Sequence, residues 1–295
     1  MESKKLDFKI DYSKLKVCEE YNAGKTEYPL VITLPHSGTY FPPEFVEQVN
    51  SSVETMRRNE DIFVDEIVRT AIDYKIPTLK MNVARAFVDL NRDRLELDPA
   101  MFYNYPEHKD VMFDKHCRVG LGVVHRINYM REPLYKGLLD YNEVELRLKK
   151  VYDVYHDKLL KMVNKCVKKF GFCLVLDCHS MPSKICSIID DRSGIDICLG
   201  TLFSQSCPAE MSDFFARQFW NKNYRVEFNC PYSGAYTTFN YCQPRRKMYT
   251  LQLEINRALY ANEDKLEKNE DFAMIADDVS NAIINLAQYL QRGQY

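Results

Sequence analysis

The sequence predicts an α/β fold in which a mainly parallel sheet carries helices on both faces. Short apolar runs of strand length alternate along the chain with longer segments of helical periodicity. The short runs are almost continuously apolar, which is typical of strands that are buried on both faces. No repeat, low-complexity tract or long Pro/Gly/Ser linker divides the 295 residues. We therefore expect a single domain over residues 1–295, with 1–27 as an N-terminal extension.

The individual elements follow from apolar periodicity and from the residues that end each segment. Pro77 ends the first long helix, and Gly171 is placed to cap the longest helix before the next strand begins. Prolines and glycines interrupt residues 95–132, where we expect an irregular excursion near the site. The predicted strands are 28–34, 78–83, 172–178, 185–190, 195–199, 224–229 and 248–255. The predicted helices are 59–74, 135–169 (with a break near Gly137 or Asn142), 208–221 and 268–292.

The composition is that of a soluble globular protein, with 46% hydrophobic and 28% charged residues. A net charge of -2 argues against a nucleic-acid partner. No run approaches 18 apolar residues, and the first residues lack the apolar core of a secretory signal, so we expect neither a membrane span nor export. The 10 cysteines contain no Cys-x-x-Cys pair, which favours reduced thiols and a cytoplasmic location.

Two histidines stand directly after predicted buried strands. His36 lies in Leu-Pro-His-Ser-Gly, and His179 lies in Asp-Cys-His-Ser-Met-Pro. Ligand sites of open α/β sheets form at strand ends, and two histidines at one edge supply two of the three protein ligands of a catalytic zinc. The alternative is an ordinary structural histidine. Asp177 shares a strand face with His179 and is placed to accept its second ring N–H.

The third zinc ligand has to come from elsewhere, because no His-x-x-x-His or His-x-x-Glu occurs at either histidine. Glu60 and Asp61 are the nearest acidic candidates, although acids at a helix start also complement the helix dipole. A proton acceptor is needed as well, and Glu254 lies among apolar residues near the end of a predicted strand. A carboxylate there is costly to bury unless it is paired, so a salt bridge to Arg257 is the alternative.

The segment from Val83 to Arg94 brings arginines together with acidic residues. Arginine binds carboxylates through two parallel hydrogen bonds, which suits an anionic substrate. A surface network of Arg85, Arg92 and Arg94 with Asp89 and Asp93 is the alternative. The residues by themselves thus indicate a metal-dependent hydrolase for an anionic substrate.

Eight segments in the same order resemble the N-formylglutamate amidohydrolase family, which is itself similar to zinc carboxypeptidases and aspartoacylase-like deacylases. They span roughly residues 30–260. The segments are Pro35–Pro42, Asp61–Ile67, Ala84–Arg92, Arg147–His156, Asp177–Pro182, Asp196–Gly200, Asn229–Gly234 and Gln252–Tyr260.

The resemblance implies a three-layer α/β/α sandwich with a mixed sheet and one zinc ion per chain. It implies His36, Asp61 and His179 as metal ligands and Glu254 as the general base, with Glu60 the rival of Asp61. Arg85 would hold the carbonyl oxygen, and Asn91 and Arg92 would bind the substrate carboxylates. The implied reaction is hydrolysis of N-formyl-L-glutamate to formate and glutamate, a step of histidine degradation.

Other functions stay open. A deacylase or carboxypeptidase for another N-acyl amino acid or peptide would use the same residues, and a metal-binding protein with decayed activity is the non-enzymatic alternative. Cys242-Gln243-Pro244, where we expect a glycine before the proline, and His125 depart from the family pattern. Both lie where they can shape the substrate pocket.

Overall fold

The structure, a computed structural model, describes residues 4–189 and 194–293. Its contacts group the chain into two compact units, each assembled from several segments. The first unit comprises Met1–Glu19, Pro35–Glu60 and Met81–Asp157, and the second comprises Glu20–Leu34, Asp61–Lys80 and Lys158–Tyr295. The expectation of one domain stays a prediction.

The main sheet has seven strands among the described residues, in the order β1-β3-β2-β4-β7-β5-β6. β2 pairs in parallel with β3 and β4, β4 with β7, and β5 with β6, whereas β5 runs antiparallel to β7. The predicted α/β fold with a mixed, mainly parallel sheet is therefore confirmed. The strands are β1 (Cys18–Tyr21), β2 (Leu30–Leu34), β3 (Thr78–Met81), β4 (Cys173–Met181), β5 (Ile197–Gly200), β6 (Val226–Phe228) and β7 (Met248–Asn256). A separate hairpin joins β8 (Ala261–Asn262) to β9 (Glu267–Lys268).

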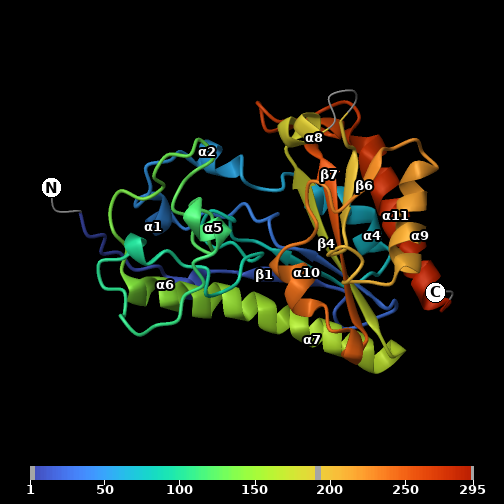
Figure 1. The fold of residues 1–295 in the computed structure, drawn as a ribbon, viewed down its shortest axis with the longest axis horizontal. Helices are drawn as coiled ribbons and strands as arrows, with labels where there is room; N and C mark the ends of the chain where they lie inside the picture. The colour runs from blue at the N-terminus through green and yellow to red at the C-terminus, as the bar shows by residue number, and fades with distance from the viewer. Residues whose placement is uncertain (1–3, 190–193, 294–295) are drawn as a thin grey trace. The chain divides into compact units, whose positions relative to one another are not determined.

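The core of the second unit lies on one face of this sheet. Leu176 and Cys178 of β4 and Leu253 and Ile255 of β7 point into it, and none of them is exposed. Fully burying such a side chain contributes about 1.5–3 kcal/mol. The helices that cover this face are α3 (Val64–Ile67), α4 (Arg69–Asp73), α9 (Ala209–Trp220) and α11 (Phe272–Gln291) (Figure 1). Helix α10 (Tyr236–Tyr241) packs against β4 and β7.

The first unit contains short helices and long loops. Residues 95–132 are mostly irregular, as predicted. The helices are α1 (Pro43–Val46), α2 (Val53–Arg57), α5 (Lys115–Arg118) and α6 (Tyr141–Arg147), with 3-10 turns at Tyr12–Lys14 and Pro99–Met101. α6 continues through a π-helical turn (Leu148–Tyr152) into α7 (Asp153–Phe170). The predicted helix thus begins later than 135, because Asp140 caps it by accepting from the Asn142 N–H.

Two predicted elements differ from the structure. Residues 185–190 are not a strand: α8 (Ser183–Ile189) is helical, and residue 190 lies outside the described residues. Ile185 and Ile189 are four residues apart, which is helical spacing, and the apolar run is too short for periodicity to decide. The predicted helix 59–74 begins only at Val64, because Phe63 before it adopts a left-handed backbone with φ 61°. No helix in the described part of the chain is long and apolar enough to cross a membrane.

Candidate functional site

The polar residues of the second unit come together because β4 and β7 run side by side in register. Asp177 lies opposite Gln252, and His179 lies opposite Glu254. Side chains alternate between the two faces of a strand, so these four share one face while Cys178 and Leu253 between them point to the core. All four are buried, with exposed fractions from 0% to 6%. A sheet whose other face is apolar therefore carries a compact polar cluster near the strand ends.

His179 is held between two carboxylates. Its Nε2 lies 2.9 Å from Oδ2 of Asp177, and its Nδ1 lies 2.8 Å from Oδ2 of Asp61. Burial lowers the pKa of His179, but Asp177 and Asp61 outweigh burial and hold this pKa well above its usual value. The predicted contact of Asp177 with the second ring nitrogen is confirmed. Both ring nitrogens of His179 therefore contact a buried carboxylate.

The pKa of the buried Glu254 carboxyl is shifted upward. Burial raises its pKa to about 7, helped by Asp61 and Asp177 and opposed by His179 and by a hydrogen bond from Gln252. The Gln252 Nε2 donates to Oε1 of Glu254 over 2.5 Å. The Thr238 hydroxyl donates to Oε1 of Gln252 over 3.3 Å, which orients this amide with its NH2 group toward Glu254.

The predicted alternative for Glu254, a salt bridge to Arg257, is wrong. The Arg257 guanidinium instead donates from Nη2 to Oδ1 of Asp61 over 3.2 Å. Asp61, rather than its rival Glu60, is the acid that contacts His179, whereas Glu60 accepts from Nε of Arg57.

In the first unit, Asp89 gathers the residues around His36. This aspartate is 0% exposed. Its Oδ1 lies 2.7 Å from Nε2 of His36, and its Oδ2 lies 2.8 Å from Nε of Arg85 and 3.2 Å from Nε2 of His125. Burial raises the pKa of Asp89, but Arg85 and His36 reverse this and hold the pKa well below its usual range. Asp89 is therefore a permanent anion that can only accept hydrogen bonds.

The contact with His36 fixes the orientation of its ring. Because Asp89 is ionised and can only accept, Nε2 of His36 donates to Oδ1 of Asp89, an arrangement also found in histidines that bind metals with a carboxylate behind them. The turn after β2 is tight. A Cβ on Gly38 would stand 2.1 Å from the carbonyl oxygen of Val83, so only glycine fits.

The structure places the remaining predicted residues of the first unit in two groups. Asn91 lies beside Asp89, to which its backbone N–H donates over 2.9 Å, and Arg92 donates from Nε to the carbonyl of Leu121 over 3.0 Å. Arg94 instead forms salt bridges with Glu145 and Asp153, at 2.8 and 2.9 Å. Of the predicted surface network, the Arg85–Asp89 pair is present, but at a buried aspartate, whereas Arg94 pairs with Glu145 and Asp153 instead of Asp89 or Asp93.

A second group of metal-binding residue types, Glu96, Asp114 and His116, lies in the irregular excursion. Nδ1 of His116 stands 2.7 Å from Asp114 and 3.2 Å from Glu96. Asp114 also caps α5, and Glu96 accepts from the backbone N–H of Asp93. These ion pairs and hydrogen bonds account for the arrangement, and we use the group below only as a control.

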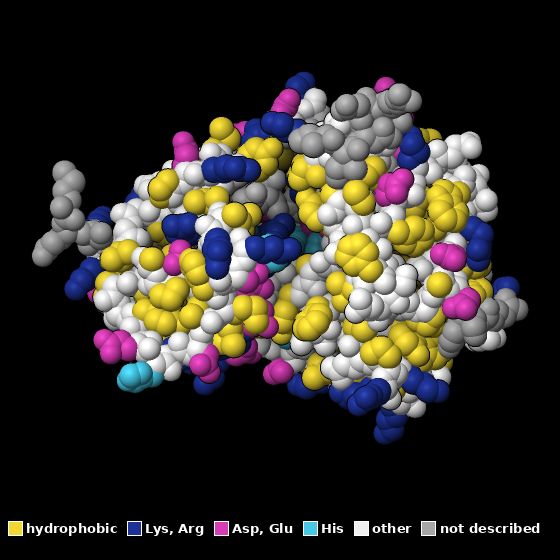
Figure 2. All heavy atoms as spheres, viewed as in Figure 1, with side chains coloured by type: hydrophobic (Ala, Val, Ile, Leu, Met, Phe, Trp, Pro, Cys, Tyr) yellow, Lys and Arg dark blue, Asp and Glu magenta, His cyan; other side chains and the backbone are white. Residues whose placement is uncertain are grey.

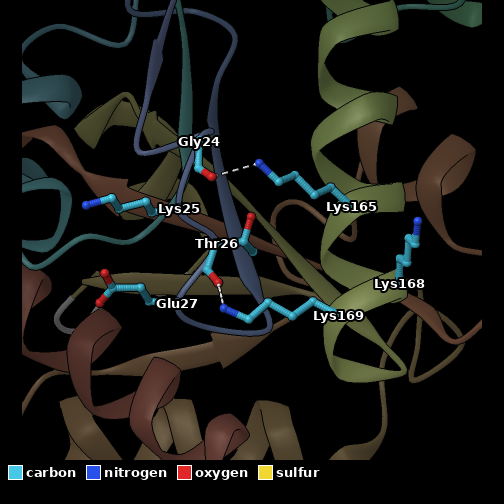
Figure 3. A pocket seen from close by; sticks show the side chains of 7 residues that line it. All are labelled: Gly24, Lys25, Thr26, Glu27, Lys165, Lys168 and Lys169. Atoms are coloured by element: carbon cyan, nitrogen blue, oxygen red, sulfur yellow. Dashed lines mark hydrogen bonds between the residues drawn. The ribbon is translucent and has the colours of Figure 1, made fainter.

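A lysine-lined pocket of about 740 Å³ lies near the N-terminal ends of β2 and β4, opposite to the ends that carry the polar cluster. Lys165 and Lys169 reach from α7 to the carbonyls of Gly24 and Thr26, whereas Lys25 and Lys168 point away (Figure 3). Lysine and arginine side chains gather over the end of α7 on the face in Figure 2. Lysines at a helix C-terminus bind free carbonyls and offset the helix dipole, so the pocket needs no ligand to explain it.

Asp89, Gln252 and His125 of these clusters were not predicted as site residues. Gln252 lies two residues before Glu254 in a strand where polar and apolar residues alternate, and this spacing could have identified it. His125 stood out only as a departure from the family pattern. It is 2% exposed, burial lowers its pKa, and Asp89 binds its Nε2.

Comparison with known proteins identifies the family of this chain. The family model for N-formylglutamate amidohydrolase matches residues 28–261. The N-formylglutamate deformylase of Pseudomonas aeruginosa is 28% identical over 245 residues, which cover 80% of this chain and 83% of the relative. That of Pseudomonas putida is 25% identical over 270 residues, covering 89% and 91%.

Solved structures give the same result. The crystal structure of N-formylglutamate amidohydrolase from Ralstonia eutropha JMP134 matches with a TM-score of 0.88 and 28% identity, covering 95% of this chain and 100% of that one. A gene product of Agrobacterium tumefaciens, at a TM-score of 0.59 and 15% identity over 94% and 98% of the two chains, shares the fold. With a family model that spans most of its length, this chain belongs to the N-formylglutamate amidohydrolase family.

Proposed function

We propose that this protein hydrolyses the formamide bond of N-formyl-L-glutamate to formate and glutamate, a closing step of histidine degradation in the cytoplasm. One zinc ion would be held by His36, Asp61 and His179. The observation that carries the proposal is the pairing of His179 with Glu254 on neighbouring strands, beside Asp61. This pairing puts a base with a pKa near neutrality next to two residues of the kinds that bind zinc.

The chemistry of the donors supports a divalent metal. His36, Asp61 and His179 are all buried. Among the described residues, the polar face of the second unit carries three carboxylates and one guanidinium. The carboxylates are those of Asp61, Asp177 and Glu254, and the guanidinium is that of Arg257. A metal bound at Nδ1 of His179 would take the place of the proton there and leave the Nε2–H donated to Asp177. The three carboxylates and Arg257 would then carry two net negative charges, which a dication would offset. His36 follows the end of β2 by two residues, and β2 is the sheet neighbour of β4, which carries His179.

Zinc at such ligands acts as a Lewis acid that polarises a carbonyl and acidifies a coordinated water. Glu254 would accept the proton of the attacking water and transfer it to the departing amine nitrogen. The water oxygen bonds to the formyl carbon, and the carbon–nitrogen bond breaks. A base with a pKa of about 7 can perform both proton transfers at neutral pH.

Arg85 would stabilise the negative charge that develops on the formyl oxygen, and Asn91 and Arg92 would bind the carboxylates of the substrate. These assignments rest on residue type and on position: Arg85 and the backbone of Asn91 contact Asp89, which also holds His36. A guanidinium that is anchored through Nε can still present its other N–H groups to a carboxylate or an oxyanion.

The test is formate release from N-formyl-L-glutamate, measured together with zinc content. We expect one zinc per chain, its loss in His36→Ala and His179→Ala, and no change in Glu96→Gln, the control in the second group. A panel of N-formyl, N-acetyl and N-succinyl amino acids and a peptide distinguishes a deformylase from another deacylase or a carboxypeptidase. Protein that holds no zinc and is insensitive to chelators would contradict the proposal and favour a non-enzymatic role.

A further inference from the structure

A short 3-10 turn follows β7, and its first side chain contacts Asp61. Arg257 begins a 3-10 turn (Arg257–Leu259) directly after the strand, and its side chain is only 7% exposed. Its Nε donates to the Ser180 hydroxyl over 2.9 Å, and its Nη2 donates to Oδ1 of Asp61 over 3.2 Å. The Ser180 hydroxyl in turn donates to the same Asp61 oxygen over 3.2 Å. The three side chains form a closed, buried triangle.

This triangle distinguishes the two oxygens of Asp61. Oδ1 is held by Arg257 and Ser180, whereas Oδ2 faces Nδ1 of His179. A carboxylate on a freely rotating side chain would present either oxygen. Here rotation would break two hydrogen bonds in a buried environment, where each lost partner is costly.

The backbone around Asp61 needs such support. Asp61 precedes α3 and lies in neither a helix nor a strand, and Phe63 holds a left-handed conformation two residues later. The hydroxyl of Tyr260, which is 0% exposed, donates to the carbonyl of Ile62 over 3.0 Å. The turn after β7 therefore contacts the Asp61 segment at two points. Arg257 binds the side chain of Asp61, and Tyr260 binds the backbone carbonyl of Ile62.

We propose that Arg257, Ser180 and Tyr260 form a clamp that presents Oδ2 of Asp61 to the metal, making them positioning residues for the third ligand. The inference rests on the proposed function and deepens it. It also gives the end of the Gln252–Tyr260 segment a role separate from that of Glu254. Groups that orient metal ligands typically change metal affinity by about 10–100-fold when removed.

The decisive variants keep charge or size while removing one contact. Arg257→Lys retains the positive charge but cannot bond Ser180 and Asp61 from two nitrogens. Ser180→Ala and Tyr260→Phe each remove one hydroxyl. Tyr224→Phe is the matched control, because its hydroxyl bonds to Asp278 over 2.7 Å and not to the Asp61 segment. Zinc affinity is measured by competition with a chelator, and the visible spectrum of Co²⁺-loaded protein reports the coordination geometry.

We expect roughly 10–100-fold weaker zinc binding in Arg257→Lys and Ser180→Ala, and a smaller loss in Tyr260→Phe, each with an altered Co²⁺ spectrum. Tyr224→Phe should match the unmodified protein in both measurements. If Ser180→Ala and Arg257→Lys bind zinc as tightly as the unmodified protein while His179→Ala does not bind it, the clamp is wrong and the ligand set stands. If His36→Ala and His179→Ala also bind zinc normally, the proposed function itself fails.

Discussion

His179 and Glu254 are register partners on the parallel strands β4 and β7, and both point to the polar face of the sheet. Two residues earlier on each strand, Asp177 and Gln252 repeat the pairing and support them: Asp177 binds the ring of His179, and Gln252 binds the carboxylate of Glu254. The geometry of the candidate site in the second unit therefore follows from the register of one strand pair.

Glu254→Gln should abolish turnover while leaving zinc bound. The amide keeps the size of the side chain but cannot take a proton, and general base catalysis contributes about 10²–10⁴-fold. The measurement is formate release alongside zinc content. Glu267→Gln, at an exposed carboxylate of the same unit, serves as the control. Activity above about a tenth of that of the unmodified protein would rule out the assigned role, given the size of this contribution.

Asp89→Asn should weaken zinc binding by about 10–100-fold, because the neutral amide no longer fixes the tautomer and orientation of His36. Asp98→Asn is a suitable control, since Asp98 is another buried aspartate of the same unit, paired with Arg126. Chelator competition measures the effect. Equal zinc affinity in Asp89→Asn and the unmodified protein would remove Asp89 from the metal site.

His156→Gln should make the folded state less sensitive to acid. Burial lowers the pKa of His156 from 6.5 to about 4, and its Nε2 donates to the carbonyl of Leu90 over 3.0 Å. Between pH 6.5 and 4 the unfolded chain takes up a proton at this position and the folded chain does not, so stability falls as the pH falls. Glutamine keeps a donor and does not titrate.

The shift corresponds to at most about 3 kcal/mol, and because the ring keeps some solvent contact we expect about 1–2 kcal/mol. Denaturant unfolding at pH 7 and pH 4.5 measures the difference, and His108→Gln, at an exposed histidine, is the control. An unchanged pH dependence in His156→Gln would show that this histidine does not contribute.

Arg147→Met should destabilise the protein by about 3–5 kcal/mol, since it leaves a buried carboxylate without its partner. Arg147 is 0% exposed, donates to Glu143 over 2.7 Å and lies over the ring of Phe87. Adding Glu143→Gln, which keeps the hydrogen bond from Tyr12, should recover part of the loss. The Glu143→Gln single variant completes a double-mutant cycle, and losses that simply add in the double variant would mean that the pair is not coupled.

Several features of the site could be read from local pattern. Period-two alternation placed Asp177 with His179, and the polar residue in an apolar strand marked Glu254. Gly171 has the positive φ of a helix C-cap, as its position predicted. Short apolar runs were less informative, because residues 185–189 suit a strand or a helix equally and neighbouring elements decided between them.

Hydrophobic periodicity and turn residues act over a few positions, so they were enough to predict the α/β class and the place of Glu254 in a strand. The strand β4 continues to Met181 and contains His179, which was predicted to follow the strand. The antiparallel direction of β5, the gathering of His36, Arg85 and His125 around Asp89, and the pairing of Arg257 with Asp61 were decided by tertiary structure. Arg257 and Asp61 are 196 residues apart in the chain. A buried charge pairs with whichever oppositely charged group the fold brings near it. The spacing of residues along the chain does not predict that partner.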